Sequence, residues 1–218
     1  MLQKKAVRSN TLELIRFLQS DEFFNDFYLV GGTALALQIG HRESIDIDLF
    51  TTKDFDVNST LEYLEQEYAF SLQLSAKNTL KGIIDDIFVD IISHKYPIIS
   101  KPVESEGIRM LSQDDIIAMK VNAIAGNGTR IKDFIDIYFL LKHHSFSDII
   151  TYYKKKYSQR NDLHAIKSLC YFGDIDQNQN WPKLLKEKDL SLEKIKNRII
   201  LSKNKYFSDN GIPKKRRG

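Results

Sequence analysis

Two short stretches of this chain constrain its fold more than any others. The first, Leu29-Val30-Gly31-Gly32-Thr33-Ala34-Leu35, is a strand-like run that ends in two glycines and continues as a helix. The second, Ile45-Asp46-Ile47-Asp48-Leu49-Phe50, is an apolar run interrupted by two carboxylates. Because strand side chains alternate between faces, Asp46 and Asp48 are expected to project from the same side. The pattern predicts a strand, a tight turn, a helix, and a second strand that carries two neighbouring charges.

Both stretches suit a site for a metal ion and a phosphate group. Two adjacent carboxylates repel each other unless a positive group lies between them. A Gly-Gly turn that opens a helix allows backbone N–H groups to approach a phosphate closely. Two roles are open for Thr33, donation to a phosphate or capping of the helix. The alternative for Asp46 and Asp48 is a surface-facing strand edge.

A third carboxylate, Asp90, interrupts the apolar segment at residues 87–93. Burial of this charge without a partner would be costly. If this segment is a strand beside residues 45–50, Asp46, Asp48 and Asp90 converge. Such a cluster can hold two Mg²⁺ ions, or Mn²⁺ in their place, around a triphosphate, one activating a hydroxyl and the other stabilising pyrophosphate. The alternative for Asp90 is a strand-end or salt-bridged side chain.

The pattern becomes helical after residue 112, and one lysine there stands out. Lys120 lies four residues from Ile116 and from Ile124, so it belongs to an apolar stripe and either reaches the edge or points into a cleft. Asp133 and Asp136 share a face of the next helix and are suited to hold Lys120 or Arg130. We expect Lys120 to contact a triphosphate, with Asp136 orienting it. The alternative is an interhelical salt bridge without substrate contact.

These motifs resemble the polymerase-β-type nucleotidyltransferase fold and, within it, the AbiEii/AbiGii toxin family. The resemblance covers residues 28–142. The residues that carry it are Gly31-Gly32-Thr33-Ala34-Leu35, His41-Arg42-x-Ser44, Asp46-Ile47-Asp48-Leu49-Phe50, Val89-Asp90, Asp114-Asp115-Ile116-Ile117-Ala118-Met119-Lys120, Ala123, Arg130, Lys132-Asp133 and Asp136-Ile137-Tyr138.

The resemblance implies a metal-dependent enzyme that moves an NMP from an NTP to a macromolecular acceptor and releases pyrophosphate. It implies the toxin of a toxin–antitoxin or phage-defence system, with a cognate antitoxin as partner and RNA, such as tRNA, as acceptor. A catalytically idle nucleotide- or RNA-binding module and a purely structural interaction module remain alternatives. The expected residues are Asp46, Asp48, Asp90, Lys120 and Asp136 for catalysis, Gly31, Gly32, Thr33, Arg42, Ser44 and Lys120 for the nucleotide, and Asp46, Asp48 and Asp90 for the metal.

The charge of the chain is divided between its two ends. Residues 151–218 contain 17 Lys and Arg against 7 Asp and Glu, a net +10, whereas residues 1–150 have 15 against 22, a net −7. A basic C-terminal part suits a polyanion such as RNA, and its alternative is solvated helix surface. The tail at 213–218 is expected to be disordered.

The sequence predicts an α+β fold: a small mixed or antiparallel sheet flanked by helices, followed by an all-helical domain. The domains are expected at 1–105 and 106–218. Strands are predicted at 27–30, 45–50, 70–75, 79–84 and 87–93, joined by an exposed loop at 41–44 and a turn at 85–86. Helices are predicted at 10–20 with Asn10 as cap, 33–39, 59–67 with a Ser59 capping box, 112–125, 131–143, 148–157, 162–172 and 192–202.

Other features of the sequence bear on where the protein is located in the cell. No apolar run approaches the roughly 20 residues that span a bilayer, and the N-terminus has no signal-peptide pattern. The single Cys170 excludes an internal disulfide and fits a reducing, cytoplasmic location without a membrane partner. Cys170 is expected in the core.

Overall fold

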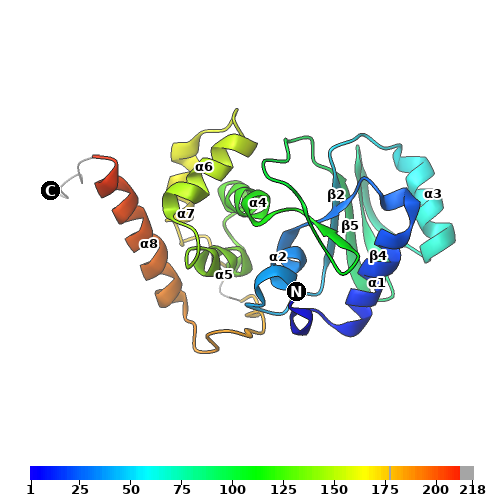
Figure 1. Ribbon diagram of the computed structural model, residues 1–218, viewed down its shortest axis with the longest axis horizontal. Coiled ribbons are helices and arrows are strands. Elements are labelled where there is room, and N and C mark those ends of the chain that lie inside the picture. The colour runs from blue at the N-terminus through cyan, green and yellow to red at the C-terminus, as the bar shows by residue number, and fades with distance from the viewer. Residues whose placement is uncertain (177, 212–218) are drawn as a thin grey trace. The chain divides into compact units, whose positions relative to one another are not determined.

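The computed structural model describes residues 1–176 and 178–211 (Figure 1). The basic tail at 213–218 lies outside the described residues. Contacts between residues divide the chain into two compact units: the sheet unit, Met1–Ile116 with Lys183–Lys186, and the helical unit, Ile117–Pro182 with Glu187–Gly218. The boundary expected at residues 105 and 106 lies in the turn between two short paired strands of the sheet unit.

The described residues of the sheet unit form a seven-stranded mixed sheet in the order β3-β4-β5-β2-β1-β7-β6. β2 runs parallel to β5, and β1 runs parallel to β7, while the other neighbours are antiparallel. This confirms the predicted α+β fold class. The strands are β1 (Tyr28–Leu29), β2 (Ile47–Thr51), β3 (Ser71–Ala76), β4 (Thr79–Ile84), β5 (Ile87–Ser93), β6 (Val103–Ser105) and β7 (Ile108–Met110).

Helices flank this sheet. The sheet unit contains α1 (Ser9–Ser20), α2 (Gly31–Ile39), α3 (Val57–Tyr68) and the short 3₁₀ helices η1 (Lys4–Ala6) and η2 (Glu22–Phe24). α3 contacts β3 and β4, and α1 contacts β7 (Figure 1). Gly40 ends α2 in the left-handed conformation, with φ +62°, as glycine does most readily.

The two faces of the sheet carry different side chains. On one face the register partners Leu49, Ile91 and Leu80 are fully buried and form the core. On the opposite face, which we call the open face, the register partners Asp48 and Asp90 are only half-buried. Because successive residues of a strand point to opposite faces, the buried aliphatic residues fix the direction in which the charged ones project.

Two predicted helix caps are wrong. α1 begins at Ser9, its N-cap residue is Arg8, and no side chain caps it, so Asn10 lies inside the first turn. α3 begins at Val57, earlier than expected, and the Asp56 carboxylate accepts a hydrogen bond from the Ser59 N–H. Asp is as good an N-cap as Ser, and the cap that lies earlier in the chain allows the longer helix.

The loop at residues 41–44 is not exposed, contrary to the prediction, because three of its four side chains are buried. A segment distant in sequence, residues 183–186, covers it. The Glu43 N–H donates to the Lys183 carbonyl at 2.8 Å, and the His41 carbonyl accepts two N–H groups from the same segment. These backbone bonds explain why residues 183–186 belong to the sheet unit.

The described part of the helical unit consists of helices and their connections. α4 (Gln113–Gly126) starts in the sheet unit and continues into this one, followed by α5 (Ile131–Leu140), α6 (Phe146–Lys156), α7 (Asp162–Leu169) and α8 (Leu192–Asp209). α8 contacts α5 and α6, and α6 contacts α7. α8 extends beyond the predicted end at residue 202, while α5 and α7 end earlier than predicted. No helix within the described residues is long and apolar enough to cross a membrane.

Asp21 links α1 and η2 to two tyrosines of α3. Its carboxylate accepts hydrogen bonds from the hydroxyls of Tyr63 and Tyr68 and from the Phe23 N–H. Burial raises the pKa of the Asp21 carboxyl, but the three hydrogen bonds together lower it by more than burial raises it. This pKa therefore lies below its ordinary value. The same contact raises the pKa of Tyr63 to about 12.

We expect Asp21→Asn to lower the free energy of unfolding by about 1–3 kcal/mol at pH 7, because charge-assisted hydrogen bonds are lost. The folded pKa is below the unfolded one, so this stabilisation is present at neutral pH and disappears as the pH falls through the lowered pKa. Urea unfolding followed by circular dichroism at neutral and acidic pH measures it. Asp26→Asn, which removes an exposed ion pair with Lys53, is the control and should change little. An equal loss for Asp21→Asn at both pH values would contradict the prediction.

Candidate active site

A row of charged side chains crosses the open face of the sheet. Asp48 on β2 is the register partner of Asp90 on β5, and Asp90 is the register partner of Lys81 on β4. Neighbouring strands lie about 4.8 Å apart, so the two carboxylates are side by side. The Lys81 ammonium forms an ion pair with Asp90, whose side chain is 24% exposed. The strand of Asp90 therefore does lie beside the strand of Asp48, and a lysine completes the row.

Lys81 is the residue at this site that sequence reasoning missed. The sequence did contain the information needed to find it, because the predicted two-residue turn at 85–86 pairs the flanking strands residue by residue. Ile84 pairs with Ile87 across this turn, and counting outward brings Lys81 opposite Asp90. The positive φ angles of both turn residues, 47° and 63°, are those that such a tight hairpin requires.

The glycine turn before α2 lies directly against Asp48. The Val30 N–H donates to the Asp48 carbonyl at 2.9 Å, which holds the end of the first strand to β2. Gly31 then adopts φ +69°, and a Cβ at this position would collide with the carboxylate oxygen Oδ2 of Asp48. Glycine is therefore required at residue 31 both by its backbone conformation and by the space that Asp48 occupies. The N-terminus of α2, with its partial positive charge, consequently lies beside a carboxylate.

A side chain at residue 32 is excluded by different neighbours. A Cβ on Gly32 would lie 2.6 Å from Nη2 of Arg42 and 3.2 Å from the Ser44 hydroxyl. Arg42 is only 2% exposed, and its Nη1 donates to the Glu43 carbonyl at 3.0 Å. The structure thus brings Arg42 and Ser44 next to the glycine turn, with a buried guanidinium beside the first residues of the helix.

Thr33 connects the helix to the start of the carboxylate strand. This residue is fully buried, its hydroxyl donates to the Asp46 carbonyl, and it lies 2.9 Å from the Ser44 hydroxyl. No side chain caps α2, so the capping role considered for Thr33 is not observed. The bond instead fixes the backbone at Asp46, whose side chain is half-buried.

Lys120 belongs to the helical unit and forms a buried ion cluster there. Its ammonium lies 2.7 Å from an oxygen of Asp133 and 2.7 Å from an oxygen of Asp136. The three side chains are at most 7% exposed, and Arg130 adds a contact of 3.5 Å to Asp133. The two aspartates thus hold Lys120 between α4 and α5. Its expected contact with a triphosphate stays a prediction.

The carboxylates of the open face do not by themselves form a complete metal site. Within residues 1–176 and 178–211, no group of three or more His, Cys, Asp or Glu side chains is arranged to hold a metal ion. The structure brings Asp48 and Asp90 together as register partners, and it brings Lys81 to the same place. A metal ion bound here would take ligands from its substrate as well as from the chain, as Mg²⁺ commonly does.

Solved structures of other proteins share the fold of this chain. A Helicobacter pylori protein proposed to be a nucleotidyltransferase superposes with a TM-score of 0.54 at 17% identity, over 95% of this chain and 99% of that one. MenT4, a nucleotidyltransferase toxin of Mycobacterium tuberculosis H37Rv, has a TM-score of 0.51 at 12% identity, over 90% of this chain and 86% of its own. At these identities the likeness shows a shared fold, and the class it defines is the nucleotidyltransferase fold.

The sequence comparisons identify the family. The family described as nucleotidyl transferase AbiEii toxin, type IV TA system, matches over residues 14–91 and 68–200. An uncharacterised protein of Aquifex aeolicus is 36% identical over 156 residues, or 69% of this chain and 75% of that protein. The chain belongs to the AbiEii family of nucleotidyltransferase toxins. It is thus a nucleotidyltransferase with a nucleotide substrate and an antitoxin counterpart, and the predicted resemblance is confirmed.

We expect Gly31→Ala to destabilise the sheet unit by about 1–3 kcal/mol more than Gly107→Ala, because only the first variant drives a methyl group into a packed neighbour. Gly107 is a matched control, since it has φ +78° in the same unit but nothing within 4 Å of its Cβ position. Chemical unfolding of both variants measures the difference. Equal losses would show that backbone strain alone, and not the contact with Asp48, keeps glycine at residue 31.

Proposed function

We propose that this enzyme transfers an NMP from an NTP to an RNA acceptor, with pyrophosphate as the leaving group and Asp46, Asp48 and Asp90 as metal ligands. The observation that carries the proposal is the pairing of Asp48 with Asp90 on the open face, against the glycine turn at the start of α2. Carboxylates beside a helix N-terminus form a site where a cation and a phosphate group can be bound together.

The side chains present suit a divalent metal ion. Asp48 and Asp90 offer hard oxygen donors on adjacent strands, and Asp46 lies two residues before Asp48, immediately before the first residue of β2. Mg²⁺ is typically bound through one or two carboxylates together with substrate phosphates, which fits an incomplete set of protein ligands. Bound there, Mg²⁺ or Mn²⁺ would make an acceptor hydroxyl more acidic and neutralise charge on the pyrophosphate.

The chain's own groups would position the nucleotide. Backbone N–H groups at Gly31 and Gly32 can donate to phosphate oxygens because neither residue has a side chain in the way. The guanidinium of Arg42, which lies next to Gly32, adds positive charge there. Ser44 and the buried Thr33 hold the backbone at Asp46, so their contribution would be to keep the carboxylate strand in position.

RNA is the acceptor class that the charge of the chain favours. The net charge of +10 on residues 151–218 is suited to a phosphate backbone, while the net −7 on residues 1–150 is suited to cations. MenT4, which shares this fold, is a nucleotidyltransferase toxin, and we propose the same biological role for this chain. Lys120 and Asp136 remain proposed contributors to catalysis, with Asp136 orienting the lysine.

Asp48→Asn and Asp90→Asn should each lower the rate of NMP transfer to RNA by at least about 100-fold, since a metal contributes several kcal/mol of charge stabilisation. The assay is incorporation of labelled nucleotide from each of the four NTPs into total RNA, with Mg²⁺ or Mn²⁺. Asp86→Asn is the control, because it makes the same change in the exposed hairpin turn of the same sheet. Full activity in both carboxylate variants, or transfer to protein and not to RNA, would refute the corresponding part of the proposal.

Lys81→Met should strengthen binding of Mn²⁺ by about two- to fivefold, because a cation that binds Asp90 must otherwise displace an ion pair worth ~1 kcal/mol or less. Calorimetric titration of the protein with Mn²⁺ alone measures this without reference to activity. The control is Lys53→Met, which breaks an exposed ion pair with Asp26 and lies beyond the C-terminal end of β2. Unchanged or weaker Mn²⁺ binding in Lys81→Met would show that Asp90 is not a ligand of the metal ion.

A further inference from the structure

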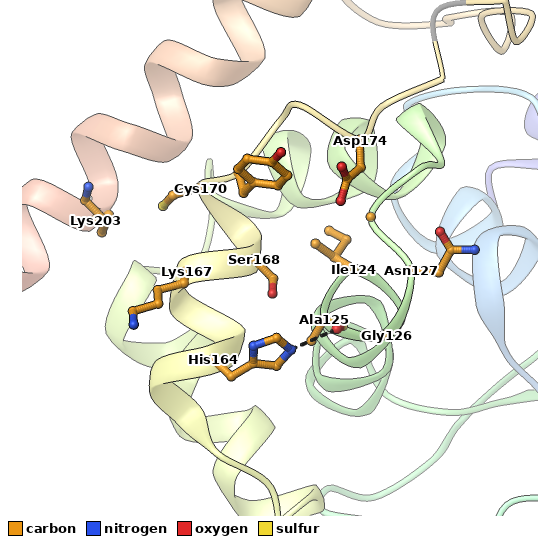
Figure 2. Close-up of a pocket in the computed structure, with 12 residues that line it drawn as sticks. Ile124, Ala125, Gly126, Asn127, His164, Lys167, Ser168, Cys170, Asp174 and Lys203 are labelled. Atoms are coloured by element: carbon orange, nitrogen blue, oxygen red, sulfur yellow. Dashed lines mark hydrogen bonds between the residues drawn. The ribbon is translucent and has the colours of Figure 1, made fainter.

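The helical unit contains a cavity of about 650 Å³ that the carboxylate site does not include. Its wall is formed by the end of α4, by α7 and the residues after it, and by Lys203 of α8 (Figure 2). The His164 ring nitrogen Nε2 lies 3.1 Å from the Ala125 carbonyl and so joins α7 to the end of α4. All of the lining residues belong to one compact unit, so the cavity is a property of that unit by itself.

Two lysine residues from different helices line this cavity. They are Lys167 on α7 and Lys203 on α8 (Figure 2). Within the part of the chain that the structure describes, neither forms an ion pair, whereas many other lysines do. Asp174 is the acidic residue of the lining. Unpaired cations that line one cavity attract an anion, and here they exceed the opposing charge.

The other lining residues supply hydrogen bonds and an aromatic face. The Ser168 hydroxyl and the Asn127 amide can donate to oxygen atoms. The Tyr171 side chain is 56% exposed, so its ring has room to stack on a planar group. Cationic groups with an accessible aromatic ring are the combination by which proteins hold single-stranded nucleic acid. The volume is also within the range of about 300–1,000 Å³ that small-molecule sites occupy.

We propose that this cavity is a second nucleotide-binding site, which takes a phosphate group on Lys167 and Lys203 and the neighbouring base on Tyr171. The nucleotide is either free or part of an RNA strand. The simpler role for Lys167, stabilising the last turn of α7, explains one lysine but not the second from another helix. The inference does not depend on the proposed transfer reaction, because no carboxylate of the open face takes part in it.

The cysteine provides a direct test. Cys170 is the single cysteine of the chain and lines this cavity. Burial raises the pKa of its thiol to about 11, although Lys203 opposes this shift. A thiol reagent used at about pH 9 therefore modifies it slowly through the small thiolate fraction. With no other cysteine present, the modification rate reports on this cavity alone.

The experiment measures that rate with inorganic pyrophosphate, with ATP, and with a single-stranded RNA of about ten nucleotides. We expect ATP or the RNA to slow modification at least about fivefold, and pyrophosphate to do so less because it lacks a base to stack. Protection by ATP identifies a free nucleotide as ligand. Protection by RNA alone, weakening as salt is raised, identifies a strand.

Matched variants locate the effect. Lys167→Met and Lys203→Met should each remove the protection, whereas Lys155→Met and Lys205→Met should keep it. The controls lose the same charge at exposed positions of α6 and α8 that do not line this cavity. For each variant, the modification rate with a probe is compared with the rate of the same variant without it, because Lys203→Met also changes the pKa of the thiol. The proposal is overturned if no probe slows modification, or if the control variants lose protection as completely as the cavity variants.

Discussion

The pairing of Asp48 with Asp90 is the constraint on which the sheet unit depends. Two carboxylates on adjacent parallel strands repel each other, and their register cannot slip by one residue without turning Leu49 and Ile91 out of the core. Burial of those aliphatic side chains therefore holds the charges together against their repulsion. Lys81, brought in by the hairpin at 85–86, supplies part of the compensating charge. Packing of the core thus fixes the positions of both carboxylates, and an ion pair with Lys81 joins one of them to β4.

The glycine turn follows from the same pairing. Because Asp48 projects onto the open face, the chain that leaves β1 must pass it, and only a residue without Cβ fits at Gly31. Gly32 lies against Arg42 for a similar reason, so each glycine makes room for one charged group. The two glycines consequently allow the N-terminus of α2 to lie against Asp48 and the Arg42 guanidinium to lie beside the same turn. In the proposed function, these are the groups that would bind a phosphate.

Local patterns predicted much of this arrangement. The tight turn at 85–86 and the apolar strand at 87–93 each need only neighbouring residues, and the structure contains both. The strand predicted at 45–50 is also present but begins at Ile47, so Asp46 lies just before it. Apart from the two helix caps, the errors concern contacts between distant segments. Burial of the 41–44 loop depends on residues 183–186, and β7 is a short strand that pairs with β1 across about eighty residues. Neither partner is marked by periodicity, since three-residue strands and irregular covering segments have none. The position of Lys81, in contrast, could have been predicted from the sequence, because counting residue pairs outward from the turn at 85–86 places it opposite Asp90.

The lysines of the helical unit illustrate how the same side chain serves opposite purposes. Lys120 is enclosed by Asp133 and Asp136, and loss of the lysine would leave two buried carboxylates without their shared cation, at a cost of about 3–5 kcal/mol. A lysine so held contributes first to the junction of α4 and α5. Within residues 1–176 and 178–211, Lys167 and Lys203 form no ion pair, and both line a cavity instead. The difference in pairing therefore separates the lysine that joins α4 to α5 from the two lysines that we propose bind a ligand.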